Sequence, residues 1–405
     1  MKILILSGYG ISITVDGGRL TIQDGHDLDQ QNPEKYVFRP KFIDLDTIIV
    51  EGDSGKISFE AIRWLTKMGV QLSVLNWDGR LLTTMYPLEY KRSDVRMAQY
   101  KAYESSQRVE FAKKIIDAKV KNSIIVLKWL GERYPEIAKA NDERMKLINS
   151  NLALLPKANR IKDIMGIEGI IAHHYWDIVS LSFDKKWDFP GRANGKTLRP
   201  MGAIDPINAL FNYGYSVLES QCWKAINANG LDPYVGFLHE NNPSKAPLVY
   251  DLQEPFRWIV DVAVITGLEK GLFLKKDFIR TRNYNTRIWS TGIKKLMGEI
   301  VEQFSKSAKY KNYNREWANI IVEMAHNLSQ YLTGKTKTLD FSNPSPQLTR
   351  DDSSAIRQQI KKISYSTWEK NGYSKGTLHY LKKNANSDRP FKIYNKGMQK
   401  LLRIN

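Results

Sequence analysis

LSVLNWDGRLLTTMY, residues 72–86, and VEFAKKIIDAKV, residues 109–120, lie on either side of a change in hydrophobic period. The first stretch holds two short apolar runs around Asp78-Gly79, a dipeptide that favours a hairpin turn. In the second stretch, apolar residues recur at the three- and four-residue steps of one helix face: Val109, Ala112, Ile116 and Val120. The chain is therefore predicted to change from strands to helices near residue 90.

The region before this change, residues 1–90, reads as β-rich. ILIL, ISITV, RLTI and TIIV are short apolar runs, and Asp16-Gly17-Gly18 supplies a second hairpin signal. SFEAIRWLTKMG, residues 58–69, predicts one helix among the strands, with Ser58 as its cap and Gly69 at its end.

The region after the change, residues 91–334, is predicted to be helical. The expected helices, with Pro- and Gly-bearing loops between them, are 96–122, 123–132, 160–183, 203–228, 252–268 and 314–333. Residues 335–350, rich in Ser, Thr and Pro, predict a linker, and residues 351–405 form a small basic tail.

Charge points to a polyanionic partner. Lys and Arg number 61 against 43 Asp and Glu, a net charge of +18. The tail alone has 12 basic and 4 acidic residues. Such an excess favours nucleic acid. Since the sequence contains neither a secretory signal nor a membrane-spanning run, we expect a cytoplasmic protein without a membrane partner. Cys222, the single cysteine, excludes a disulfide framework and a cysteine-rich zinc site.

Glu168 stands out within MGIEGIIAHHYWDIVSL, a predicted helix. Its neighbours on the same face are apolar or aromatic: Ala172, Tyr175 and Val179. A carboxylate on such a face must be paired, protonated or bound to a cation. A partner arginine or backbone donor is the alternative to a metal ion.

A second group of candidate ligands lies downstream. His239, in a loop, is either a metal ligand or a structural histidine. Asp251 and Glu254 stand on one face of a predicted helix, a spacing that also fits a capping box without metal. His173 and His174 are rival ligands, but adjacent helical residues point about 100° apart and are not expected to share one ion.

Glu168, His239 and Glu254, with Asp251 in support, form a nitrogen–oxygen ligand set. Oxygen ligands suit magnesium, and the imidazole shifts the preference toward manganese. Either ion, magnesium or manganese, would neutralise charge on a phosphate and polarise an attacking hydroxyl. The first three residues are therefore predicted to be catalytic as well as metal-binding.

Three sequence blocks resemble the CRISPR adaptation integrase-endonuclease family. GLDPYVGFLHE, residues 230–240, followed by DLQEPFR, residues 251–257, is similar to the catalytic segment of that family. IEGIIAHHYW, residues 167–176, resembles its upstream metal-binding helix. DPINALFNYGYSVLES, residues 205–220, resembles the helix between them. The resemblance covers about residues 1–335.

The resemblance implies an α+β multidomain fold. Residues 1–90 would form a β-sandwich-like dimerisation domain and residues 91–334 an α-helical catalytic domain. The family's metal ligands match Glu168, His239 and Glu254, whereas Asp251 matches a neighbouring acidic position. Asn208 falls on a polar position of the middle block and is a candidate DNA contact.

The tail departs from members that serve CRISPR arrays. Its sequence reads as three short helices: SSAIRQQIKKI, SYSTWEKN and SKGTLHYLKKNA. The third is predicted to be capped by Ser374 after Gly372. Its inward-facing residues are expected to be Leu378, Leu381 and Ala385. The residues expected to face outward and bind DNA are Lys375, His379, Lys382 and Lys383. This resembles a helix-turn-helix over residues 351–405. The alternative is a helical hairpin packed on the catalytic domain.

Casposases, the relatives encoded by mobile elements, carry added DNA-binding modules of this kind. The sequence therefore favours a casposase-type transposon integrase that joins DNA 3′-hydroxyl ends to duplex target DNA by transesterification. One alternative is a CRISPR spacer-acquisition integrase, which would work with a small second adaptation protein. A non-catalytic DNA-binding protein is an alternative of another class. It is disfavoured because a protein that binds DNA by charge alone gains nothing from carboxylates near the phosphates.

Double-stranded target DNA and DNA ends are the expected partners, with a homodimer that could become a tetramer on DNA. Arginines at or after the catalytic helix are candidate phosphate contacts: Arg257, Arg280, Arg282 and Arg287. Ordinary solvated surface is the alternative for all four.

Overall fold

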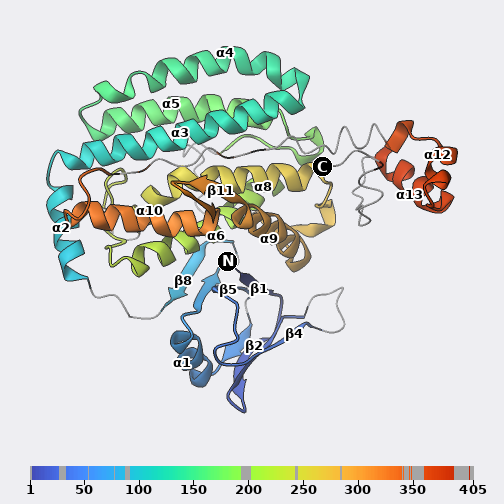
Figure 1. Ribbon diagram of the computed structural model, residues 1–405, viewed down its shortest axis with the longest axis horizontal. Coiled ribbons are helices and arrows are strands. Elements are labelled where there is room, and N and C mark those ends of the chain that lie inside the picture. Colours follow the sequence, from blue (N-terminus) through green and yellow to red (C-terminus); the bar gives the residue numbers. More distant parts are fainter. Residues whose placement is uncertain are drawn as a thin grey trace.

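Figure 1 shows a β region, a larger helical region and a separate pair of small helices in a computed structural model. The structure describes residues 2–26, 33–52, 54–76, 78–86, 92–192, 202–241, 245–282, 285–339, 341, 346, 348, 360–386 and 401. The mixed α+β class predicted from the sequence is confirmed.

Two four-stranded sheets make up the β region. One has the order β1-β5-β7-β8, with parallel pairing except at β8: β1 (Ile3–Ser7), β5 (Thr47–Glu51), β7 (Gln71–Leu75) and β8 (Leu81–Met85). The other has the order β4-β3-β2-β6: β2 (Ile11–Asp16), β3 (Arg19–Gln23), β4 (Lys35–Phe38) and β6 (Gly55–Ile57).

A shared core joins the two sheets to α1 (Phe59–Lys67). Its buried residues come from both sheets and the helix, among them Leu6, Ile13, Ile22, Ile48 and Leu65. The predicted cap of this helix is confirmed, because Ser58 Oγ accepts a hydrogen bond from Ala61 N at 3.1 Å. Gly69 follows the helix at φ +70°, as expected for a terminating glycine.

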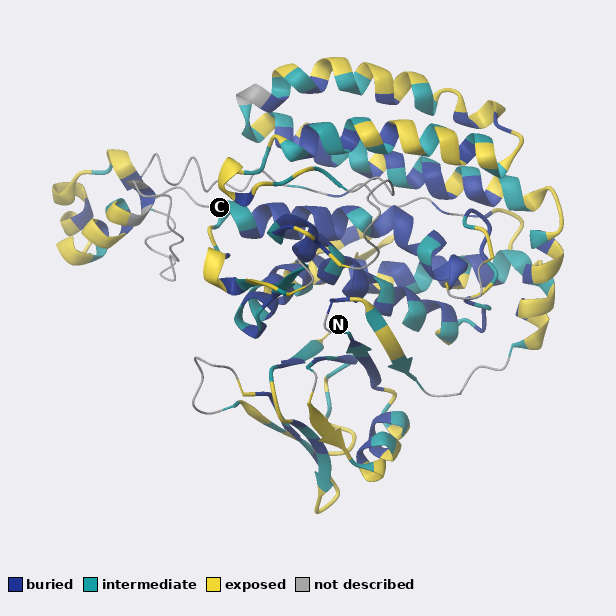
Figure 2. Cartoon of the chain, turned by 180° about the vertical axis from the view of Figure 1, so that it is seen from behind, coloured by how far each residue is buried: buried dark blue, intermediate teal, exposed yellow. Residues whose placement is uncertain are grey.

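The helical region surrounds α6, most of whose residues are buried (Figure 2). Its α-helices are α2 (Ser93–Tyr103), α3 (Gln107–Arg133), α4 (Pro135–Leu152), α5 (Ile161–Ser180), α6 (Pro206–Ala228), α7 (Pro247–Gln253), α8 (Arg257–Glu269), α9 (Ser290–Ser305) and α10 (Trp317–Leu332). In Figure 1, α3, α4 and α5 lie together on the side away from the β region.

Short elements connect these helices. The 3₁₀ turns are η1 (Leu155–Lys157), η2 (Lys185–Trp187), η3 (Glu254–Phe256) and η4 (Lys275–Asp277). Two hairpins follow α8 and α9: β9 (Phe278–Arg280) with β10 (Thr286–Ile288), and β11 (Ser307–Tyr310) with β12 (Tyr313–Glu316).

Several predicted helix boundaries were wrong. The break expected after residue 122 does not exist, because α3 continues through it, and the Ser123 hydroxyl donates to the Lys119 carbonyl of the same helix. The chain instead breaks between α2 and α3 at residues 104–106. The helix predicted over 252–268 is interrupted at Pro255, which lacks the amide that an α-helix needs. The sequence reading also missed α4 and α9.

The β region packs directly on the helical region. Ile49 and Leu75 belong to the same core cluster as the helices. Gln71 Nε2 donates to the Ser220 carbonyl of α6 at 3.0 Å. Lys294 of α9 pairs with the buried Asp24 carboxylate at 2.5 Å. These contacts fix the β region against α6 and α9.

The tail forms its own small core. The helices α12 (Tyr365–Lys370) and α13 (Lys375–Asn386) bury Trp368 together with the three residues predicted to face inward, Leu378, Leu381 and Ala385. Ser374 Oγ accepts a hydrogen bond from Thr377 N at 3.3 Å, as expected for a cap. The first predicted helix, residues 353–363, lies mostly outside the described residues.

The segment predicted as a linker also carries core residues. Leu339 and Phe341 are buried in the main core, so this part of residues 335–350 is packed on the helical region. Within the described residues, no helix is both long and apolar enough to span a membrane.

Gly79 tests the contact between the β region and α6. It has a φ of +82°, and a Cβ here would lie 2.4 Å from Tyr213 Cδ2. We expect Gly79→Ala to lower the free energy of unfolding by about 2–4 kcal/mol, from a left-handed backbone and overpacking together. Urea denaturation measures this change.

The matched control is Gly298→Ala, at an exposed position of α9 with no atom near the added methyl group. It should stabilise the protein by up to about 1 kcal/mol, because alanine favours helix. Equal stability of Gly79→Ala and the wild type would contradict the packing described here.

Candidate functional site

Three elements bring two carboxylates and an ammonium together. Lys119 Nζ of α3 lies 2.5 Å from Glu168 Oε1 of α5 and 2.5 Å from Glu254 Oε2 of η3. All three side chains are at most 18% exposed. The structure therefore joins two of the predicted ligands through a lysine that the sequence reading did not identify.

The electrostatics of this cluster depend on the lysine. Burial alone would raise the pKa of Glu254, but the charges of Lys119 and Arg257 outweigh it and lower that pKa to about 2. Burial works against the Lys119 ammonium as well, yet the two carboxylates raise its pKa above the usual value. Both groups are thus held in their charged forms at neutral pH.

One buried oxygen of the cluster faces a cation directly. Glu254 Oε2 is enclosed by protein, and the Lys119 ammonium lies 2.5 Å from it. A buried carboxylate oxygen needs such a positive partner. The donor chemistry at this point fits a divalent metal ion.

The backbone of η3 is held by two buried amides. Asn122 of α3 donates to the Pro255 carbonyl at 2.9 Å. Gln253 donates to the Tyr215 carbonyl of α6 at 2.7 Å. Because Asn122 lies one turn after Lys119, a single helix both fixes η3 and supplies the ammonium that faces Glu254.

Asp251 organises the loop that carries His239. Its Oδ2 accepts from the amides of Phe237 at 2.5 Å and Leu238 at 3.0 Å. Its Oδ1 accepts from the amide of His239 at 3.0 Å and lies 2.7 Å from Nδ1 of the same histidine. The carboxylate is therefore engaged in positioning His239, whose remaining nitrogen is Nε2.

The pKa of the His239 imidazole depends on the charges around it. Burial would lower its pKa, but the hydrogen bond and charge of Asp251 raise it above the usual value, with a further contribution from Glu254. Gly236 allows the loop to approach, since a Cβ there would lie 2.6 Å from Pro247 Cβ and 2.9 Å from Asp251 Oδ2. His239 thus lies within the electrostatic reach of the cluster.

A tyrosine stands beside His239 and hydrogen-bonds to a further carboxyl group. The rings of Tyr250 and His239 meet edge to face, with centroids 6.0 Å apart. Burial raises the pKa of Glu219 to about 7, against the hydrogen bonds of Trp223 and Tyr250. Tyr250 therefore connects His239 to a carboxyl group with a raised pKa.

Arg257 links the cluster to a second buried carboxylate. Its guanidinium lies 3.7 Å from Glu254 Oε1 and stacks 4.0 Å over the Tyr215 ring. Asp261, in turn, accepts from Tyr215 at 2.5 Å and from Tyr175 at 2.6 Å. This predicted phosphate contact is thus held rigidly beside Glu254.

Comparisons with known proteins identify the family of the chain. The family model described as "CRISPR associated protein Cas1" matches residues 4–302. The chain belongs to the Cas1 family. The family resemblance inferred from the three sequence blocks is confirmed.

Individual Cas1 proteins are similar over nearly their whole length. A CRISPR-associated endonuclease Cas1 from Archaeoglobus fulgidus is 29% identical over 349 residues, which cover 84% of this chain and 98% of the relative. A second one, from Methanospirillum hungatei, is 30% identical over 337 residues, covering 82% and 96%.

Two solved structures are similar to this chain. A casposase bound to integration product has a TM-score of 0.81 and 45% sequence identity, covering 90% of this chain and 100% of that chain. A CAS1 protein from Thermotoga maritima, with a TM-score of 0.63 and 18% identity, covers 82% and 97% and shares the fold.

Asn208 has an internal position in this Cas1-family chain. It is 7% exposed, and its amide nitrogen donates to Asp205 Oδ2 at 2.6 Å and the Gly191 carbonyl at 3.0 Å. Its oxygen accepts from Arg192 at 3.0 Å. The structure therefore places Asn208 where it anchors Arg192, and its contact with DNA stays a prediction.

The other predicted arginines lie on the β9–β10 hairpin. Arg280 and Arg282 are exposed, whereas Arg287 is half-buried. Arg280 lies on β9 and Arg287 on β10, and the two strands pair in antiparallel register.

The rival histidines form a further group on α5. Contrary to the expectation from helix geometry, His173, His174 and Asp177 place one ligand atom each within 4.8 Å of one another. Arg144 of α4 already lies 3.0 Å from the Asp177 carboxylate and 3.2 Å from His174 Nδ1. This group is more exposed than the Lys119 cluster and has a cation of its own.

Lys119→Met tests the ion cluster in chelator-treated protein. Loss of the ammonium leaves Glu168 without this cation and Glu254 with the more distant Arg257, so we expect about 3–5 kcal/mol lower unfolding free energy at neutral pH. Ionised Glu254 stabilises the wild type above about pH 4.5, and this contribution is lost as pH falls toward 2. The deficit of the variant should therefore shrink in acid.

Denaturant titrations at several pH values measure this deficit. Lys121→Met is the matched control on the same helix, since its ion pair with Asp117 is exposed and should contribute about 0–1 kcal/mol. Similar effects of the two substitutions would show that the cluster does not depend on Lys119.

Proposed function

We propose that this chain is a casposase-type DNA integrase that joins DNA 3′-hydroxyl ends to duplex DNA with the help of a divalent metal ion. The casposase similarity, at 45% identity over the full length of that chain, supports the class. The single observation that carries the chemistry is the convergence of Glu168 and Glu254 on one ammonium beside His239.

Glu168, Glu254 and His239 would hold the metal. The Lys119 ammonium marks the position where a cation meets both carboxylates, and Glu254 Oε2 supplies a buried carboxylate oxygen there. Two carboxylates and one imidazole suit magnesium or manganese. Asp251 would orient His239 from behind rather than bind the ion, as outer partners of metal-binding histidines do.

The bound metal would supply charge neutralisation at the scissile phosphate and polarise the attacking 3′-hydroxyl. The hydroxyl oxygen forms a new bond to phosphorus, the bond from phosphorus to the target 3′-oxygen breaks, and that oxygen leaves with a proton. One phosphodiester replaces another, so no energy source or covalent protein–DNA intermediate is needed. Arg257, rigid over Tyr215, would hold a phosphate oxygen beside the site.

The tail would act as a helix-turn-helix. Of the residues predicted to face DNA, Lys375, His379 and Lys383 are exposed, and Lys382 is half-buried with its ammonium 5.1 Å from the centre of the Tyr365 ring. The small separate core of α12 and α13 supports a module that positions DNA.

The partners proposed are target DNA, DNA ends and a second copy of the chain, with four copies assembling on DNA. The similar casposase is bound to integration product, which favours a transposon role. Service to a CRISPR array with a small second adaptation protein is the other candidate. A neighbour of the same fold at 16% identity is named a Cas6-RT-Cas1–Cas2 complex.

Substitution of the proposed ligands tests the chemistry. Glu168→Ala, His239→Ala and Glu254→Ala should each reduce metal-dependent strand joining by at least about a hundred-fold, since each removes a ligand. Joining of a labelled DNA 3′ end to a plasmid measures this loss. Circular dichroism and DNA anisotropy should show that fold and DNA binding persist.

Glu110→Ala is the control, a carboxylate of α3 that is 65% exposed and outside the cluster. It should join strands at the wild-type rate. Wild-type joining by Glu254→Ala would refute the proposed site.

Deletion of residues 351–405 separates target choice from chemistry. All proposed ligands lie between residues 168 and 254, so the deleted protein should still reverse integration on a preassembled branched DNA. Its insertions into a plasmid should scatter, because the proposed reader of the target is gone. Sequencing of insertion sites measures the scatter, and unchanged sites would show that the tail does not select them.

A further inference from the structure

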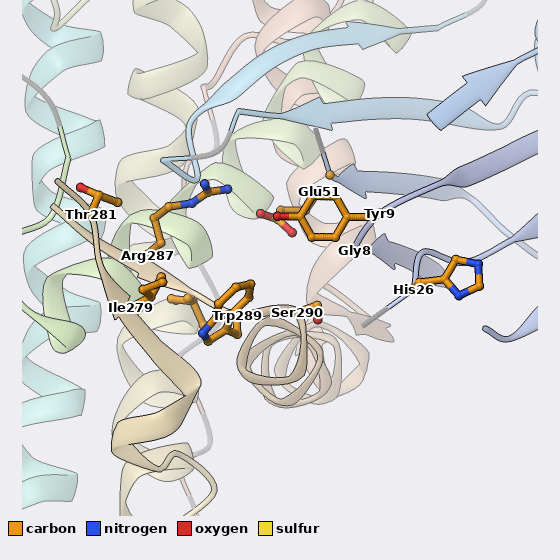
Figure 3. A pocket seen from close by; sticks show the side chains of 11 residues that line it. Gly8, Tyr9, His26, Glu51, Ile279, Thr281, Arg287, Trp289 and Ser290 are labelled. Atoms are coloured by element: carbon orange, nitrogen blue, oxygen red, sulfur yellow. The ribbon is translucent and has the colours of Figure 1, made fainter. Parts of the chain in front are cut away.

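A pocket of about 350 Å³ lies where the β region meets the β9–β10 hairpin and the start of α9. Figure 3 shows Tyr9 and Glu51 projecting into it from the β region, with Arg287 and Trp289 on the hairpin side. None of the proposed metal ligands lines this pocket. It is therefore distinct from the Lys119 cluster.

The pocket walls offer flat apolar surfaces. Tyr9 is 55% exposed and Ile279 is 40% exposed, so both are accessible to a ligand. The Trp289 ring is half-buried beside them. Aromatic side chains in such an open pocket suit the face of a planar ring, as in proteins that stack unpaired bases.

The polar groups of the pocket discriminate between ligands. Glu51 is 6% exposed, and its carboxylate accepts from Tyr213 of α6 at 3.4 Å. Arg287 lines the same pocket. A buried carboxylate disfavours a phosphate group, whereas a carboxylate near an arginine suits a ligand that offers both donors and acceptors.

The hairpin is firmly held in this position. Trp289 N donates to the Asp277 carbonyl at 2.8 Å, and Lys295 pairs with the Asp277 carboxylate at 2.7 Å. Thr286 N donates to the Ala203 carbonyl at 2.6 Å. The exposed side chains of Arg280 and Arg282 lie on the same hairpin and would bind the backbone of a strand that enters the pocket.

We propose that this pocket binds an unpaired guanine of the DNA substrate, an inference that rests on the proposed function. Guanine offers the N1 and 2-amino donors to the Glu51 carboxylate and the O6 and N7 acceptors to Arg287. Tyr9 and Trp289 stack on its faces. The pocket thus selects DNA that carries a single-stranded base near the junction of the two regions.

Duplexes with short single-stranded tails test this proposal. Each tail is abasic except for one nucleotide, which carries guanine or inosine. The position of this nucleotide differs from one duplex to the next. At one position we expect guanine to lower the Kd about ten-fold relative to the abasic tail, the size of one stacked base. Inosine, which lacks the 2-amino group, should give a smaller gain. Fluorescence anisotropy measures each affinity.

Variants test whether the pocket causes the higher affinity for guanine-bearing tails. Trp289→Ala and Tyr9→Ala should each remove the guanine gain, and Glu51→Gln should remove the difference between guanine and inosine. Phe59→Ala, an aromatic side chain of the same region that is 79% exposed, should keep both effects. Affinity for blunt duplex should remain at the wild-type value in Trp289→Ala.

The outcomes separate this proposal from the proposed function. If guanine does not improve binding at any position, or if Trp289→Ala and Tyr9→Ala keep the guanine gain, the pocket does not bind guanine, although blunt-duplex binding continues. Absence of binding and joining by the wild type on blunt duplex would instead overturn the integrase function.

Discussion

The structure depends on the neutralisation of two buried carboxylates from different elements. Glu168 and Glu254 would repel each other if they were both charged and unpaired in a poorly solvated place. Lys119 lies 2.5 Å from an oxygen of each and holds Glu254 ionised. The cluster is therefore assembled around a positive charge, which is the condition that a metal site also requires.

The surrounding fold fixes the geometry of this charge. The α3 helix supplies Lys119 and, one turn later, Asn122, whose amide holds the Pro255 carbonyl. Asp251 fastens the His239 loop with three amide contacts and one imidazole contact. Because both anchors are buried, the proposed ligands are positioned before any metal or DNA binds.

Local patterns predicted the change from strands to helices and the cap of α1, but not α4, α9 or the partners between elements. Glu168 was singled out because a carboxylate on an apolar face needs a counterion, and Asp251 and Glu254 because their spacing puts them on one helix face. Lys119 was missed, since one lysine among several on the same helix gives no signal until α3 is packed on α5 and η3. Asn208 looked like a DNA contact by its position, yet the folded chain directs its amide inward to Asp205 and Arg192.

The central claim is that one divalent ion sits among Glu168, Glu254 and His239. Pulsed electron paramagnetic resonance of Mn²⁺ bound to the full chain tests it most directly, because it detects nitrogen from a coordinated imidazole. The account predicts a nitrogen coupling that disappears in His239→Ala and persists in His173→Ala. A coupling that survives in His239→Ala but is lost in His173→Ala would place the ion at the exposed α5 group and contradict the account.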